Sequence, residues 1–467
     1  MSTDVFSNIS PLDHRYLMSN PKLHSKMAQY LSEGAYVKYE LLVESALTRV
    51  LSRRGLCPSD VADEVERACN EITAEEVYAE EQITRHNIRA LVNCIQRRVS
   101  ESARPYVHFT ATSVDIMDTA NALRYRDFTR DVIMPEGLAL LQTLIDLARR
   151  EKRTVQMGRT HGQHAVPITF GFAVAEYIAR LGNRLAEIER TANNLRGKMA
   201  GAVGAYNASS IFFEDAETFE REVLGELGLL PAEYATQIVM PEYVTDYVHA
   251  VVSGFGVLAN LADDVRHLQR SEIGELAERF EKGQVGSSTM PHKRNPWNFE
   301  HVKSLWKTFM PRMMTVYMDQ LSEHQRDLTN SASGRFVTEI LAGFVLAMHR
   351  LQSVVSKLVV DTARMSANFE ASKDNVIAEP LYILLAASGH PDAHEAVRRL
   401  SVEASSKQMT VRELVDQKPE FAEFLAGLSE KQKEYLSRPE TYIGRSVQKT
   451  EVICEIWQKF VDERTCR

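Results

Sequence analysis

The sequence predicts an all-α protein whose central part is a bundle of about five long helices. Prolines are absent from residues 168–230, 242–290 and 312–379, so nothing in these windows forces a long helix to break. Within each window, apolar residues recur at intervals of three and four, the period of a helix that packs along one face. Alternation of apolar and polar residues, which is typical of half-buried strands, is scarce.

The five helices rest on five apolar stripes, taken here in chain order. Their members are Leu138, Leu141, Ile145 and Ala148; Ile178, Leu181, Leu185, Ile188, Ala192, Leu195 and Met199; Leu258, Leu261, Val265 and Leu268; Val302, Leu305 and Phe309; and Ile340, Phe344, Ala347, Leu351 and Val355. Pro135 precedes the first helix, and Pro311 is expected to kink the fourth. Such long stripes are rarely buried within one small monomer, so we expect a homo-oligomer whose bundles pool into one helical core, a tetrameric one on the resemblance described below.

Shorter helical patterns with more turn signals flank the bundle, and 467 residues exceed what one hydrophobic core fills. We therefore expect three mostly helical domains. They are an N-terminal domain over residues 1–111, the long-helix bundle over 112–364, and a C-terminal cap over 365–467.

Charge and cysteine content narrow the class of protein. A formal net charge of −8 argues against a nucleic-acid or membrane surface, because either would need a basic excess. No apolar run approaches the roughly 18 residues of a membrane span, so a cytoplasmic protein is expected. The five cysteines are scattered without zinc-ligand spacing, which is typical of reduced thiols.

No histidine pair has the full pattern of a metal site. His390 and His394 are four residues apart, but Pro391 interrupts them and the glutamate of a metalloprotease helix is missing. His161 and His164 could share a metal, but no third ligand is nearby, and this hypothesis is the weaker one. We expect no metal.

Three polar clusters interrupt the helical patterns. In HFTATSVDIMDTA, Thr112 and Ser113 precede an apolar-periodic run with Asp115 and Asp118 in its first turns. Taken alone, these hydroxyls are better explained as a helix N-cap than as a binding site. A helix N-terminus can nevertheless also bind an anion.

The second cluster is MGRTHGQHAVPITFG, which looks too interrupted for regular secondary structure. Arg159, Thr160, His161 and Gln163 crowd five positions there. So many polar groups are costly unless they face a ligand or one another, which favours a functional role.

The third cluster is GQVGSSTMPHKRNPWNFE, residues 283–300. Pro291 and Pro296 exclude a regular helix across it, so a loop that could close over a substrate is expected. It does not have the pattern of a phosphate-binding P-loop. A solvated basic loop would not explain the paired serines or Asn295.

These clusters resemble the three signature regions of the fumarase/aspartase superfamily, in the same order along nearly the whole chain. The segments that carry the resemblance are TSVDIMDTA, GRTHGQHAVPITFG and GSSTMPHKRNP. Within the superfamily, SPLDHRY, TRHN, ATQI and QRDLTNSASGR resemble the adenylosuccinate lyase family. Argininosuccinate lyases and fumarases usually carry QKKNP or GKVNP in the loop instead of HKRNP.

The resemblance implies three helical domains assembled as a homotetramer, with active sites built from three subunits. The implied activity is β-elimination of fumarate from adenylosuccinate and from succinyl-aminoimidazole-carboxamide ribotide. The implied partners are a nucleotide substrate and further copies of the chain, with neither nucleic acid nor membrane. No cofactor is implied.

The resemblance also assigns roles to residues. Ser287 is the implied base, His161 the implied general acid and Lys293 the cation that stabilises the charge. Residues implied to bind substrate are Arg15, Tyr16, Arg85, His86, Asn87, Thr112, Ser113, Thr160, Gln237, Ser288, Met290, Asn295, Arg326, Ser331 and Arg335. Of these, Arg15, Tyr16, Arg326, Ser331 and Arg335 are implied to hold the phosphate.

Three positions depart from the family pattern. Asn87 stands where an aspartate is usual, Thr110 where a glycine is usual, and Gly334 where an acid is often found. Two alternatives to this activity are kept, and the departures favour the first of them. One is a superfamily lyase acting on a different succinyl-substituted amine, and the other is a non-catalytic protein on the same scaffold.

Overall fold

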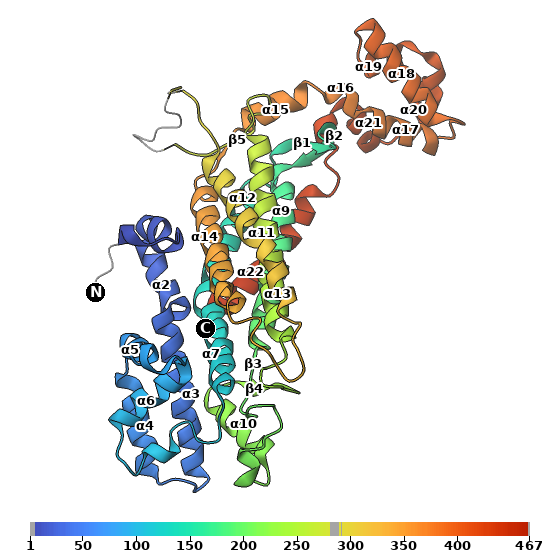
Figure 1. Ribbon diagram of the computed structural model, residues 1–467. Coiled ribbons are helices and arrows are strands. Elements are labelled where there is room, and N and C mark those ends of the chain that lie inside the picture. Colours follow the sequence, from blue (N-terminus) through green and yellow to red (C-terminus); the bar gives the residue numbers. More distant parts are fainter. Residues whose placement is uncertain (1–4, 281–288, 291, 466–467) are drawn as a thin grey trace. The chain divides into compact units, whose positions relative to one another are not determined.

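The structure is a computed structural model that describes residues 5–280, 289–290 and 292–465 (Figure 1). Helices dominate, and the strands within this part of the chain form only three two-stranded pairs, so the all-α prediction is confirmed. The chain divides into two compact units. Unit 1 comprises residues 1–137, 183–256 and 304–348, and unit 2 comprises 138–182, 257–303 and 349–467. The expected domain boundaries after residues 111 and 364 stay a prediction.

Five long helices contribute residues to both units, and they correspond to the five apolar stripes. They are α8 (Met134–Arg150), α9 (Phe170–Asn193), α11 (Glu242–Leu268), α12 (Trp297–Phe309) and α14 (Val337–Val355). Behind α12, a 3-10 turn around Pro311 interrupts the helix before α13 (Met313–Met318), as expected. Within the described residues, no helix is both long and apolar enough to cross a membrane.

One of the five apolar stripes was predicted to continue beyond the end of its helix. The stripe of α9 was expected to reach Met199, but the helix ends at Asn193 and the chain enters β3 (Arg196–Gly197). Leu195 and Met199 are buried all the same. Spacings of three and four therefore marked burial correctly there, but burial alone does not distinguish a helix from a buried turn.

Unit 1 contains the N-terminal helices and the start of the central ones. Its further elements are α1 (Leu17–Ser19), α2 (Pro21–Leu31), α3 (Glu33–Arg53), α4 (Ser59–Glu71), α5 (Ala74–Thr84), α6 (Asn87–Arg98), α7 (Ser113–Phe128), α10 (Ala216–Glu226) and the parallel pair β3–β4 (Leu230–Pro231). In its core the ring of Phe255 packs against Phe309 and Phe344, at centroid distances of 6.4 and 5.8 Å. Gly343 permits this, because a Cβ there would lie 2.3 Å from the Phe309 ring.

Unit 2 contains two antiparallel strand pairs and the C-terminal helices. Its elements are β1 (Val155–Thr160), β2 (Gln163–Thr169), β5 (Leu276–Ala277), β6 (Val359–Val360), α15 (Thr362–Glu370), α16 (Lys373–Val376), α17 (Ala378–Ala387), α18 (Ala393–Lys407), α19 (Val411–Gln417), α20 (Ala422–Ala426), α21 (Glu430–Ser437) and α22 (Ser446–Thr465). Helices α17 to α21 share a hydrophobic core that runs from Ile377 to Leu436. The Trp457 ring of α22 packs against Gly182 of α9, where a side chain would not fit.

Candidate active site

In unit 1, the first polar cluster forms the start of α7. The backbone N–H of Thr112 donates to Oδ2 of Asp115 at 2.8 Å, so the helix-cap interpretation of this segment is correct. Asp115 is fully buried and also accepts N–H bonds from Ala200 and Gly201 at 3.2 and 3.3 Å. Ser113 is the first residue of the helix. The two neighbouring hydroxyl residues therefore lie at the positive end of a helix that is held by a buried carboxylate.

The segment just before α7 is strained. His108 and Thr110 have φ angles of 61° and 68°, in the left-handed region that favours glycine. His108 is held there by Glu44 of α3, whose Oε1 lies 2.6 Å from its Nδ1. Burial lowers the pKa of His108, but the Glu44 carboxylate outweighs this and the net shift is upward. The departure at Thr110 thus places a branched side chain where the backbone conformation suits glycine.

Residues 84–87 link α5 to α6, and Asn87 contacts α7. Arg85 ends α5 with a φ of 56°, and His86 is the N-cap of α6, where its Nδ1 accepts the N–H of Arg89 at 3.2 Å. A ring nitrogen that accepts cannot carry the proton, so the other nitrogen, Nε2, is free to donate. The amide of Asn87 reaches Sδ of Met117 on α7 at 3.6 Å. Asn87, which departs from the family pattern, therefore bonds to α7 with its side-chain amide and not to the neighbouring His86.

The structure brings together two of the expected substrate-binding segments. The N–H of Gln237 donates to the carbonyl of Gln325 at 3.2 Å, next to Arg326. Two residues further along, the N–H of Val239 donates to the carboxylate of Asp118 at 2.9 Å. Gln237 is thereby tied to the Arg326 segment and to α7.

Arg326 has an unusual environment. Both terminal nitrogens of its guanidinium are buried and have no hydrogen-bond partner within the described residues, and its φ is 154°. Burial raises the pKa of the nearby Asp118 carboxyl to about 6, against the opposing effects of Val239, Lys198 and Arg326. A buried guanidinium with unmet donors suits an anionic ligand.

The remaining expected phosphate ligands lie in unit 1 but are more open. Arg15 and Tyr16 end the short helical turn Leu12–Tyr16. Ser331 and Arg335 are exposed, the latter in a 3-10 turn, Ser333–Phe336. At Gly334 an added Cβ would meet nothing within 4 Å, so this departure leaves open space beside Arg335.

In unit 2, the second polar cluster is a β-hairpin, so the expectation of irregular structure was wrong. Strands β1 and β2 pair up to Thr160 and Gln163, and His161 and Gly162 form the turn, with φ angles of 53° and 73°. Two consecutive positive φ angles are the requirement of a tight hairpin turn, which Gly162 meets without strain. Short strands with a turn at a histidine lack the apolar alternation by which hairpins are recognised in a sequence. His161 is exposed at the tip.

Arg159, one of the crowded polar residues, faces a buried carboxylate. Its terminal nitrogens lie 2.5 and 3.2 Å from the two oxygens of Glu275, which is fully buried. Glu275 also accepts from the side-chain amides of Gln156 and Asn368, at 2.8 and 2.9 Å. The polar groups of the hairpin base therefore satisfy one another, whereas Thr160 and His161 stay exposed.

The third cluster is described only in part. Ser287 and Ser288 lie outside the described residues, and Met290 and Lys293 are exposed, with the N–H of Lys293 donating to the carbonyl of Met290 at 3.0 Å. Asn295 is half-buried. The flanks of the segment are joined by Glu278, which precedes it and accepts the N–H of Asn298 at 2.9 Å at the start of α12.

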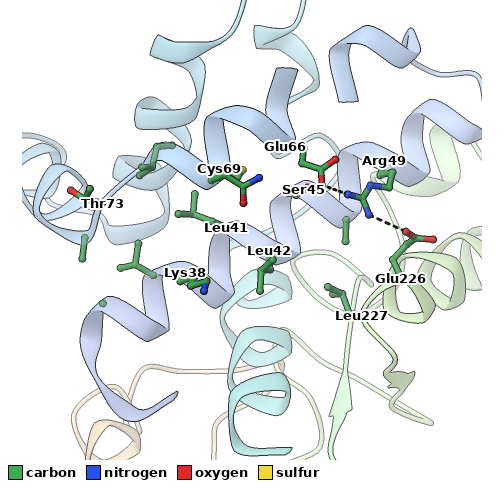
Figure 2. A pocket seen from close by; sticks show the side chains of 16 residues that line it. Lys38, Leu41, Leu42, Ser45, Arg49, Glu66, Cys69, Thr73, Glu226 and Leu227 are labelled. Carbon is green, nitrogen blue, oxygen red and sulfur yellow. Dashed lines mark hydrogen bonds and ion pairs between the residues drawn. The ribbon is translucent and has the colours of Figure 1, made fainter. Parts of the chain in front are cut away.

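A cavity of about 350 Å³ lies apart from these clusters, between α3, α4 and the end of α10 (Figure 2). None of the expected site residues lines it. Arg49 in its wall is paired with Glu66 at 2.5 Å and with Glu226 at 3.5 Å, as the dashed lines in Figure 2 show. The charge of Arg49 is thus already compensated, and this cavity does not correspond to the site that the sequence indicates.

A single protein family model covers all three polar clusters. A family model described as "Lyase" matches residues 14–308, and one described as "Adenylosuccinate lyase C-terminal" matches residues 322–443. Adenylosuccinate lyase from Archaeoglobus fulgidus is 32% identical over 95% of this chain and 97% of its own length. The enzyme of that name from Pyrococcus horikoshii is 33% identical over 94% of this chain and 95% of its own.

The chain belongs to the adenylosuccinate lyase family. It is therefore a lyase, within the superfamily that the three signature segments indicated. Solved structures of the superfamily have the same fold. A 3-carboxy-cis,cis-muconate lactonizing enzyme from Pseudomonas putida matches 93% of this chain and 97% of its own, with a TM-score of 0.81 and 25% identity. A fumarate lyase from Mesorhizobium sp. BNC1 matches with a TM-score of 0.80 and 24% identity, over 92% and 97% of the two chains.

Several residues that organise the site of this adenylosuccinate lyase family member were missed in the sequence. Asp115 and Asp118 were treated only as residues of a helix start, and Lys198, Glu275 and Glu278 were not singled out. Asp115, Lys198 and Glu275 are buried charged residues, each next to a buried apolar position. A charge among apolar neighbours was the available signal, because burial of a charge is rare unless it is paired. Among the described residues, no group of three metal-ligating side chains is close enough to hold a metal ion.

Proposed function

We propose that this lyase cleaves adenylosuccinate to AMP and fumarate, and succinyl-aminoimidazole-carboxamide ribotide to its carboxamide and fumarate. The observation that carries this proposal is the pairing of Gln237 with the Arg326 segment. It ties Gln237 to the segment of a buried guanidinium whose terminal nitrogens have no partner within the described residues, and such a group suits an anionic substrate. The names of the relatives support the same choice.

The difficult step is removal of a proton from a carbon next to a carboxylate, because a second negative charge develops beside the first. In our proposal the alkoxide form of Ser287 takes this proton, and Lys293 and Asn295 stabilise the negative charges of the alkoxide and of the carbanion. Thr112 and Ser113, at the positive end of α7, bind a carboxylate of the succinyl group with Gln237. Ser288 and Met290 are further ligands of the succinyl group in this proposal.

His161 protonates the departing nitrogen from the opposite face. Its imidazole is exposed at the hairpin tip, where a substrate can reach it, and histidine is the side chain that most often acts as a general acid. Thr160 lies beside it, and Arg85, His86 and Asn87 line the nucleotide side. Arg15, Tyr16, Arg326, Ser331 and Arg335 bind the phosphate, because arginine forks match phosphate oxygens.

We also propose a homotetramer in which each active site draws residues from more than one subunit. Large apolar side chains are exposed in and beside α13, and exposed apolar patches commonly mark association surfaces. They are Met310, Met314, Tyr317, Met318 and Leu321. Four described cysteines are buried free thiols, which suits the reducing cytoplasm as the proposed location.

The central test is incubation of the purified protein with adenylosuccinate and measurement of released fumarate. We expect Ser287→Ala and His161→Ala to lose turnover by about two to four orders of magnitude. His394→Ala, a change of another exposed histidine, should retain wild-type turnover. Absence of fumarate with the wild-type protein would refute the proposal.

Two further measurements address substrate class and assembly. Removal of the substrate's phosphate should raise KM strongly, whereas equal turnover without phosphate would favour a lyase for a different succinyl-substituted amine. Mixing the Ser287→Ala and His161→Ala proteins should restore part of the activity, since a mixed tetramer contains some sites with both wild-type residues. No recovery after subunit exchange would argue against shared sites.

A further inference from the structure

The hairpin that carries His161 has a second polar contact, on the strand opposite Arg159. Arg159 and His164 are direct cross-strand partners, one pair before the turn-closing pair Thr160 and Gln163. Directly opposed residues lie on the same face of a hairpin. Nδ1 of His164 lies 2.6 Å from Oγ of Ser372, in the short link between α15 and α16.

The base of the hairpin is therefore held on both strands. On β1, Arg159 makes its two-oxygen contact with the buried carboxylate of Glu275, next to β5. On β2, His164 bonds to Ser372. The helix α15, which ends two residues before Ser372, is tied to the first anchor by Asn368, whose amide donates to Glu275 and to the carbonyl of Ile273, each at 2.9 Å.

The charges at this position favour a neutral His164. Burial lowers the pKa of His164, and the neighbouring Arg159 lowers it further, while Glu275 opposes both. A neutral ring can share one hydrogen bond with the Ser372 hydroxyl and does not add a second cation beside Arg159. His164 is thereby unsuited to replace His161 as the proton donor.

A bulge in the hairpin accompanies this arrangement. The register shifts between Met157 and Arg159, where Ala165 and Val166 together oppose Gly158. A Cβ at Gly158 would lie 2.4 Å from the carbonyl of Val166, so this close approach requires glycine. Bulges re-aim side chains, and this one precedes the Arg159–His164 pair.

We propose that Arg159–Glu275 and His164–Ser372 form a clamp that positions His161, with His164 and Ser372 as positioning residues and not as ligands of a metal or substrate. The proposal rests on the proposed function in so far as His161 is the general acid. His161 lies at the tip of a two-residue turn, so the orientation of its side chain depends on how firmly the base of the hairpin is held. A displacement of 1 Å is enough to impair such a transfer.

The first experiment does not depend on any substrate. Hydrogen exchange of the ligand-free protein is measured over residues 155–169 for the wild type, Ser372→Ala and Glu275→Gln. We expect both variants to exchange about tenfold faster in this segment, because each loses one anchor. Ser356→Ala is the matched control, since its exposed hydroxyl donates to the carbonyl of Ser353 and its removal should change nothing in the hairpin.

The second experiment measures turnover of adenylosuccinate by the same proteins. We expect Ser372→Ala to lower kcat about tenfold with KM within about twofold of wild type, because a general acid acts in the transition state and not in binding. Ser372→Thr keeps a hydroxyl and should recover most of the loss. If Glu275→Gln does not fold, the milder change Ser372→Ala still tests whether the clamp positions His161.

Each outcome has a distinct meaning. Wild-type exchange rates in the hairpin of Ser372→Ala would overturn the clamp, even if the protein proves inactive on adenylosuccinate. Faster exchange with unchanged kcat, or a rise in KM alone, would overturn the positioning of His161. A wild-type protein that releases no fumarate would instead refute the proposed function, and the exchange data would still judge the clamp.

Discussion

The ammonium of Lys198 and the carboxylate of Asp115 form an ion pair from which solvent is fully excluded. Lys198 also donates to the carbonyl of Gly201 at 3.2 Å. Asp115 in turn holds the start of α7 at Thr112. One buried pair thus connects the segment after β3 to the helix end that carries two expected substrate-binding hydroxyls.

Lys198→Met is expected to destabilise the protein strongly. It removes one partner of a buried pair and leaves the charge of Asp115 uncompensated, at a cost of about 3–5 kcal/mol. Urea unfolding monitored by circular dichroism measures this. The matched control is Lys433→Met, which breaks an exposed pair with Glu430 and should leave the midpoint unchanged. Equal effects of the two changes would contradict the importance of the buried pair.

Thr110→Gly is expected to stabilise the protein by about 1 kcal/mol. It relieves a branched residue with a φ of 68° and removes a buried hydroxyl that has no partner in the described part of the chain. These gains exceed the cost of a more flexible unfolded chain. Thermal unfolding provides the measurement.

The change His108→Gly tests whether backbone strain at His108 or its side-chain contact with Glu44 has the larger effect on stability. Its φ of 61° would also suit glycine, but the change removes the contact with Glu44 and leaves a fully buried carboxylate unpaired. We therefore expect destabilisation at His108 and stabilisation at Thr110. Stabilisation by both changes would show that backbone strain outweighs the His108–Glu44 contact.

Glu40→Gln is expected to change how stability depends on pH. Burial, with Glu33 adding to it, raises the pKa of Glu40 to about 8 from its usual 4.5. Between these two values the folded protein keeps a proton that the unfolded chain has lost, so stability falls as pH rises, by about 1.4 kcal/mol per pH unit. Glutamine is neutral throughout and removes this contribution.

The measurement for Glu40 is the unfolding free energy from pH 5 to pH 9 for both proteins. The gap between Glu40→Gln and wild type should widen up to about pH 8 and then become constant. Glu455→Gln, a change of an exposed glutamate, should run parallel to the wild type. A constant gap over the whole range would refute the raised pKa.

Arg326→Gln is expected to raise KM for the proposed substrate at least about tenfold. The buried guanidinium nitrogens have no partner in the described residues and are available to an anion, and a charge-assisted hydrogen bond contributes about 1.5–3 kcal/mol. Steady-state kinetics measure the change. Arg438→Gln, in an exposed pair with Glu434, is the control and should leave KM unchanged. An unchanged KM for Arg326→Gln would remove Arg326 from the binding site.

The sequence by itself determined the helical class, the five long helices and the superfamily. Apolar stripes report burial directly, since a helix must hide one face, and the loop motif GSSTMPHKRNP is specific enough to indicate a lyase. It also supplied the candidate residues, because chemistry depends on residue type, which a sequence displays.

Only the tertiary structure decided what those polar residues contact. His161 lies on a hairpin that could not be predicted from alternation of apolar and polar residues. Arg159 binds Glu275, which lies more than a hundred residues away in the chain. Gln237 and Arg326 meet through backbone hydrogen bonding at Gln325. Such pairings depend on distance in space and on exclusion of water, and neither follows from spacing along the chain.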